Sequence, residues 1–140
     1  MRIIHFEDSV DKHLEIFRVL MRTGIQDSVW VTSVEDGVKE IEAALESETP
    51  LDLAITDMHY PIRKGGPADW KAGERLIQIL MEREIDLPVI VCSAGNFRIS
   101  GTYGCIWYSN LSDWETELTG LVEKRKKELM KKTCRAYACM

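Results

Sequence analysis

The sequence predicts an α/β fold in which helices cover both faces of a parallel sheet. Five short apolar stretches rich in β-branched residues alternate with segments whose apolar residues have helical spacing. Two of these stretches, residues 51–56 and 89–92, are apolar almost throughout, as expected of strands covered on both faces. The alternation of strand and helix implies parallel strands joined by right-handed crossovers.

The elements follow one another in a regular order. We expect strands at residues 2–6, 29–34, 51–56, 89–92 and 105–108. Helical apolar spacing occurs within residues 10–21, 38–45 and 76–81, and again after residue 113. Ser112 or Asp113 suits the N-cap of the last helix because a short polar side chain can accept a hydrogen bond there. Pro61 and the Gly65, Gly66 and Pro67 cluster predict a long loop after the third strand.

Composition limits the class of protein. A length of 140 residues fits one domain, which we place at residues 1–132, with a C-terminal tail at 133–140. The net charge of -5 argues against a nucleic-acid binder. No apolar run reaches the length needed to span a bilayer, so we expect no membrane partner and a cytoplasmic location.

Two local features have alternative interpretations. Residues 124–135 contain seven Lys and Arg residues, which favour a solvated helix end over a contact with an acidic partner. The four cysteines have neither the pattern of a disulfide framework nor the short spacing of zinc ligands, so we expect reduced thiols.

Acidic and hydroxyl residues stand where the predicted strands end. In open parallel sheets, ligands bind outside the carboxyl ends of the strands. Glu7 and Asp8 follow the first strand, Asp57 the third, Ser93 the fourth, and Tyr108 or Ser109 the fifth. Two carboxylates about 4 Å apart repel by about 4 kcal/mol at an effective dielectric near 20, so the cluster needs a cation or a raised pKa. Carboxylates that leave room for water and phosphate oxygens predict Mg²⁺.

Three segments resemble the receiver domains of two-component response regulators. Their sequences are IIHFED at 3–8, LAITDMHYP at 53–61 and LPVIVCSA at 87–94. The shared pattern is an acidic pair, an aspartate with proline four residues later, and a serine that ends the next apolar strand. The resemblance covers most of the chain and implies a flavodoxin-like, five-stranded parallel sheet.

The resemblance also implies roles for individual residues. Glu7, Asp8, Asp57 and the backbone carbonyl of His59 would bind Mg²⁺, and Asp57 would accept a phosphoryl group. Ser93 would donate a hydrogen bond to that group. The phosphodonor would be a histidine kinase or a phosphotransfer protein, and a further protein would receive the output.

The sequence departs from the family pattern in three places. The family has a lysine after the fifth strand, where this chain has Tyr108 or Ser109, and Lys64 or Arg98 are candidates to replace it. The loop after Pro61 is longer than in the family, and the glycine-rich stretch after Ser93 leaves the fourth helix reduced or missing. We therefore expect partner contacts to involve the 62–71 loop or the basic last helix. Trp70 in that loop is either an exposed anchor or a cap on the core.

Three functions are compatible with these residues. The leading one is a stand-alone, atypical receiver that binds Mg²⁺ and is phosphorylated on Asp57. The second is an interaction module with the same fold and no phosphorylation. The third is a magnesium-dependent phosphohydrolase, but common enzymes of that type have a second aspartate where this chain has His59, so we expect no enzyme activity.

Overall fold

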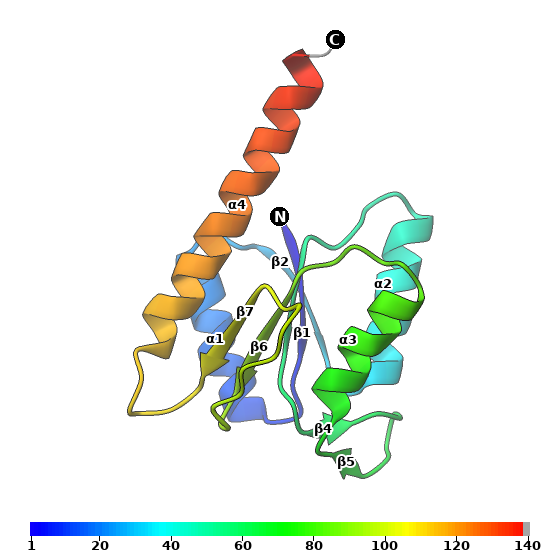
Figure 1. Ribbon diagram of the computed structural model, residues 1–140, viewed down its shortest axis with the longest axis vertical. Coiled ribbons are helices and arrows are strands. Elements are labelled where there is room, and N and C mark those ends of the chain that lie inside the picture. The colour runs from blue at the N-terminus through cyan, green and yellow to red at the C-terminus, as the bar shows by residue number, and fades with distance from the viewer. Residues whose placement is uncertain (139–140) are drawn as a thin grey trace.

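A five-stranded parallel sheet forms the centre of the chain in the computed structural model, which describes residues 1–138 (Figure 1). The strands lie in the order β2 (Asp27–Val31), β1 (Arg2–Phe6), β3 (Leu53–Thr56), β6 (Val89–Ser93) and β7 (Gly104–Trp107). Each neighbouring pair is parallel. The predicted α/β class and parallel sheet are confirmed.

Four described helices cover the two faces of this sheet. Helices α1 (Val10–Arg22) and α4 (Trp114–Ala138) lie on one face, and α2 (Val34–Glu46) and α3 (Ala72–Glu82) lie on the other (Figure 1). Successive strand residues point to opposite faces. Ile3 therefore belongs to the core under α1 and α4, whereas Ile4 belongs to the core under α2 and α3.

Serine side chains start the first two helices. Ser9 caps α1 by accepting a hydrogen bond from the backbone N–H of Lys12, and Ser33 caps α2 in the same way with Asp36. The prediction of a strand over residues 29–34 is wrong at its end, because β2 stops at Val31 and the Ser33 cap starts a helix there. The last helix begins at Trp114, as expected after Asp113.

The long loop after β3 contains a small antiparallel pair that the sequence did not predict. Strand β4 (Tyr60–Pro61) pairs with β5 (Ala68–Asp69), and α3 follows directly. Between β6 and β7 the described chain has turns and bends but no helix, which confirms that the usual fourth helix is missing. Both departures lie near the carboxyl edge of the sheet, where a ligand would bind.

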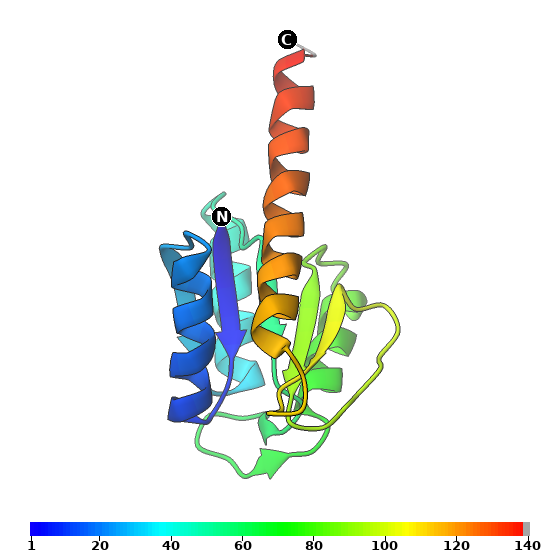
Figure 2. The same ribbon diagram turned by 90° about the vertical axis from the view of Figure 1, so that its left-hand side faces the viewer.

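Helix α4 extends beyond the sheet on the side opposite the carboxyl ends of the strands (Figure 2). It continues to Ala138, so most of the segment expected as a tail is helical, and residues 139 and 140 lie outside the described residues. The interpretation of the basic segment as fully solvated is wrong for Arg125. That side chain is 9% exposed and donates a hydrogen bond to the carbonyl of Asp52. None of the described helices is both long and apolar enough to cross a membrane.

Candidate functional site

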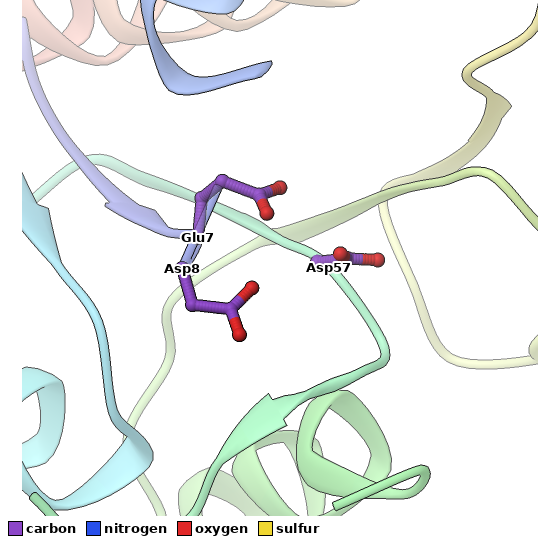
Figure 3. A group of neighbouring side chains, drawn as sticks. All are labelled: Glu7, Asp8 and Asp57. Atoms are coloured by element: carbon purple, nitrogen blue, oxygen red, sulfur yellow. The ribbon is translucent and has the colours of Figure 1, made fainter. Parts of the chain in front are cut away.

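Three carboxylates meet at the carboxyl edge of the sheet. Glu7 and Asp8 follow β1 and Asp57 follows β3, and these two strands are neighbours. Carboxylate oxygens of the three residues lie within 4.8 Å of one another, as the sequence predicted (Figure 3). Glu7 is buried, Asp57 is partly buried and Asp8 is exposed, so solvent reaches the group from the Asp8 side.

A lysine that the sequence analysis did not select lies against this acidic group. Lys12, in the first turn of α1, is 7% exposed. Its Nζ atom lies 3.0 Å from Oε1 of Glu7 and 3.3 Å from Oδ2 of Asp57. The same atom donates a hydrogen bond of 2.8 Å to the backbone carbonyl of Cys92 in β6. The ammonium therefore joins the ends of three neighbouring strands.

The spacing of α1 contained a signal for this lysine. The buried residues of the helix are Lys12, Ile16, Val19 and Leu20, which form one face at helical spacing. Lys12 stands four residues before Ile16 and extends the apolar stripe toward the N-terminus of the helix. Side chains in a helix lean toward its N-terminus, so Lys12 points back to the end of β1.

Burial and charge change the pKa values in the cluster. Burial raises the pKa of Glu7 to about 7, and the nearby Lys12 ammonium opposes that shift. Burial alone would lower the pKa of Lys12, but the carboxylates of Glu7 and Asp57 outweigh it and raise that pKa. Lys12 is therefore charged at neutral pH.

The Coulombic attraction of Lys12 to Glu7 and Asp57 can be compared with the repulsion between these two carboxylates. At an effective dielectric near 20, charges 3.0 to 3.3 Å apart attract by about 5 kcal/mol, and carboxylates within 4.8 Å of each other repel by at least about 3 kcal/mol. Lys12 thus offsets the repulsion between Glu7 and Asp57. Asp8 has no ion-pair partner among the described residues, so it retains a charge that a cation can neutralise.

Backbone contacts fix the orientation of Asp57. Its N–H donates to the carbonyl of Phe6, and its Oδ1 atom accepts a hydrogen bond of 2.7 Å from the N–H of Met58. Only Oδ2 then faces Lys12. Helix α3 packs close behind, because a Cβ atom at Gly73 would lie 2.5 Å from the carbonyl oxygen of Asp57.

A cavity of about 410 Å³ opens at this edge of the sheet. Its lining includes all three carboxylates, Lys12, the predicted Ser93 and the side chains of Met58, His59, Trp70, Phe97 and Tyr108. Ser93 ends β6 as expected, and its Oγ accepts a hydrogen bond from the N–H of Gly95. The volume is that of a small-molecule site, and its lining combines acidic and aromatic residues.

The structure corrects the two candidates for a replacement lysine. Neither Lys64 nor Arg98 lines the cavity, and Arg98 donates instead to the carbonyls of Phe97 and Cys105. Of the two residues after the fifth strand of the sheet, Tyr108 lines the cavity and Ser109 does not. Lys12 Nζ lies 5.1 Å from the centroid of the Tyr108 ring.

Trp70 is exposed at the rim of the cavity. Its exposed fraction is 75%, so the interpretation of Trp70 as a cap on the core is wrong. The ring stacks on the imidazole of His59 at 4.0 Å between centroids. His59 directly precedes β4 and Trp70 directly follows β5, so the stacked pair joins the two ends of this hairpin at the cavity.

No family model matches the sequence, and no curated protein matches it either. Solved structures do match. The N-terminal domain of a response regulator/sensory box/GGDEF protein from Carboxydothermus hydrogenoformans aligns over 95% of this chain and 99% of its own, with a TM-score of 0.66 and 17% identity. The chain has the fold of a response regulator receiver domain.

Two further receiver structures agree. The signal receiver domain of a putative Luxo repressor protein from Vibrio parahaemolyticus has 17% identity and a TM-score of 0.64, over 92% of this chain and 95% of its own. The signal receiver domain of an HD domain-containing protein from Pseudomonas fluorescens Pf-5 has 12% identity and a TM-score of 0.65, over 93% of this chain and 97% of its own. The receiver fold therefore spans nearly the whole chain, although the described part has no helix between β6 and β7.

The donor atoms of the receiver site fit a hard divalent cation. Asp8 is the exposed carboxylate of the group, and Asp57 is partly exposed. Glu7 is buried, with Oε1 facing Lys12 and Oε2 accepting a hydrogen bond from the N–H of Ser9. Both oxygens of Asp57 also have partners, the N–H of Met58 and the Lys12 ammonium, but Asp57 is only partly buried. One or two carboxylates completed by water are what Mg²⁺ prefers, so the residues fit this ion.

Proposed function

We propose that this chain acts in phosphorelay signal transduction by accepting a phosphoryl group on Asp57 with Mg²⁺ bound beside it. The observation that carries the proposal is the convergence of Glu7, Asp8, Asp57 and Ser93 on one cavity at the carboxyl edge of a receiver-type sheet. Asp57 has its Oδ1 atom fixed by a backbone N–H, which leaves Oδ2 as the nucleophile.

The reaction requires a displacement at phosphorus. An oxygen of the ionised Asp57 carboxylate forms a bond to phosphorus, and the bond between phosphorus and the donor breaks. With a phosphohistidine of a kinase or phosphotransfer protein, the imidazole nitrogen keeps the electron pair and takes a proton from water. Glu7, Asp8, Asp57 and the His59 carbonyl would hold Mg²⁺, which when bound neutralises charge on the carboxylate and the phosphoryl oxygens. Ser93 would donate its hydroxyl to a phosphoryl oxygen.

Intact mass tests the phosphorylation directly. Native protein incubated with acetyl phosphate and Mg²⁺ should gain the mass of one phosphoryl group, and Asp57→Asn should gain none. Ser93→Ala should change the yield or the lifetime of the modified form. An unmodified native protein under all donors would exclude the proposal.

Metal binding has a separate test. A ligand that binds only the folded state stabilises it, so excess Mg²⁺ should raise the unfolding temperature of native protein. Asp8→Ala removes the exposed carboxylate and should abolish the gain. The assignment is wrong if Asp8→Ala gains as much as native protein.

One observation favours the alternative of a phosphorylation-independent interaction module. Lys12 already neutralises Glu7 and Asp57, and Tyr108 stands where the family has its lysine. The absence of a mass gain, with the protein folded, would favour this alternative.

The output partner is expected to contact the hairpin side of the domain. Trp70 is an exposed aromatic residue next to the acidic group, and the usual fourth helix is missing from the described chain. Amide hydrogen exchange with and without a phosphoryl mimic should therefore change in residues 62–71. A change confined to residues 96–120 would refute this surface.

A further inference from the structure

We propose that Lys12 binds the phosphoryl oxygens of modified Asp57, and that the first turn of α1 supplies the positive charge which the end of β7 lacks. This inference rests on the proposed phosphorylation and names the residue that recognises the product. The lysine that serves this purpose is then on a helix rather than after the last strand of the sheet.

Distance and direction favour Lys12. Its Nζ atom lies 3.3 Å from Oδ2 of Asp57, the carboxylate oxygen that is not held by a backbone N–H. A phosphoryl group on Oδ2 would be attached at the atom that the ammonium already faces. Lys12 is also the only Lys or Arg among the described residues that line the cavity.

Phosphorylation of Asp57 would move negative charge from its carboxylate to phosphoryl oxygens that Lys12 can bind. Before the reaction the ammonium faces two carboxylates, those of Glu7 and Asp57. Formation of the acyl phosphate removes the charge from the Asp57 carboxylate and adds negative charge on the phosphoryl oxygens next to it. Lys12 can then exchange one partner for another while Glu7 and the Cys92 carbonyl still hold it.

The surroundings of Lys12 keep its side chain in this position. The lysine is 7% exposed, and its ammonium lies 5.1 Å from the centre of the Tyr108 ring. A flexible lysine loses conformational entropy when it binds an anion, and this one has already lost it in the folded protein. The site is therefore preorganised for an anion next to Asp57.

A purely structural role must be separated from this one. Lys12 also neutralises the buried Glu7, so Lys12→Met alone would leave an unpaired charge and could unfold the protein. The Glu7→Gln background removes that charge. In this background, Lys12→Met takes away the ammonium without stranding Glu7.

The experiment compares Glu7→Gln with Glu7→Gln/Lys12→Met, alongside native protein and Lys12→Arg. Phosphorylation by acetyl phosphate with Mg²⁺ is followed by intact mass, and affinity for the phosphoryl mimic BeF₃⁻ is measured by titration. A hydrogen bond to a charged group is worth about 1.5 to 3 kcal/mol, so loss of Lys12 should weaken BeF₃⁻ binding by about 10- to 150-fold. Lys12→Arg should keep most of the affinity. Thermal unfolding confirms that each variant is folded.

A relocated charge gives a second test. Tyr108→Lys, added to Glu7→Gln/Lys12→Met, places an ammonium at the end of β7 on the same cavity and should recover part of the lost affinity. Equal BeF₃⁻ affinity and phosphoryl yield, within twofold, in Glu7→Gln with and without Lys12 would overturn the role of Lys12 alone. Native protein that neither gains mass nor binds BeF₃⁻ would overturn the proposed function as well.

Discussion

His5 makes the stability of this protein sensitive to acid. The residue is in β1, is 2% exposed, and belongs to the face of the sheet under α1. Its Nδ1 atom lies 3.2 Å from Nδ1 of His13, and its Nε2 atom is buried without a hydrogen-bond partner among the described residues. Burial, together with His13 and Lys12, lowers the pKa of His5 from 6.5 to about 3. The folded protein therefore holds this imidazole neutral.

The size of the effect follows from the two pKa values of His5. The unfolded chain binds a proton near pH 6.5, whereas the folded protein does so only near pH 3. The unfolded state binds more protons in this range. The contribution of His5 to the free energy of unfolding is therefore fully present above pH 6.5 and is lost as the pH falls toward 3. Between pH 7.5 and pH 4.5 the loss in free energy of unfolding amounts to about 3 kcal/mol, a large fraction of the stability of a typical domain.

The test is urea unfolding of native protein and His5→Leu at pH 7.5 and pH 4.5. Leucine fills a similar volume and removes a buried polar atom without a partner, so the variant should be nearly as stable as native protein at pH 7.5. Native protein should lose about 3 kcal/mol more than His5→Leu on acidification. Equal acid losses in native protein and His5→Leu would refute the reasoning.

Further predictions concern two close backbone contacts and the exposed tryptophan. Gly37→Ala should cost about 1 to 3 kcal/mol in chemical denaturation, because its Cβ would lie 1.9 Å from the Phe6 ring. Gly120→Ala, in open space on α4, should instead stabilise by about 0.5 to 1 kcal/mol, and equal effects at the two sites would contradict the packing. Gly73→Ala should lower the phosphoryl yield in the mass assay, since α3 must move away from the loop that carries Asp57, and an unchanged yield would contradict this expectation. Trp70→Ala should change stability by less than about 0.5 kcal/mol, because the side chain is 75% exposed, and a larger loss would place it in the core.

The sheet and the acidic group were predictable for related reasons. Apolar periodicity located every strand of the sheet to within a few residues, and parallel strands place their carboxyl ends at one edge. Glu7, Asp8 and Asp57 therefore converge wherever β1 and β3 are neighbours. The missing helix after β6 was also predictable, since glycine-rich sequence lacks helical spacing.

The position of Lys12 was harder to predict. Its place in the first turn of a helix is compatible with an ordinary solvated lysine, and lysines are rarely buried without a partner. Which way the side chain turns depends on the rotation of α1 against the sheet, and burial depends on carboxylates supplied by two other strands. The β4–β5 pair was missed for a similar reason, because two-residue strands produce no periodic pattern.

Helix α4 is long enough to extend beyond the sheet that it covers. It starts beside the strand ends that carry the acidic group, crosses the sheet, and reaches beyond the opposite edge (Figure 2). Its 25 residues span about 37 Å. Leu118 and Val122 hold its first half in the core, while Met130 in the second half is exposed. A tilt of about 10° where the helix leaves the core would displace its far end by about 3 Å, because the second half of the helix is about 19 Å long. Any change in the angle of α4 would therefore produce its largest displacement at the end that lies beyond the sheet.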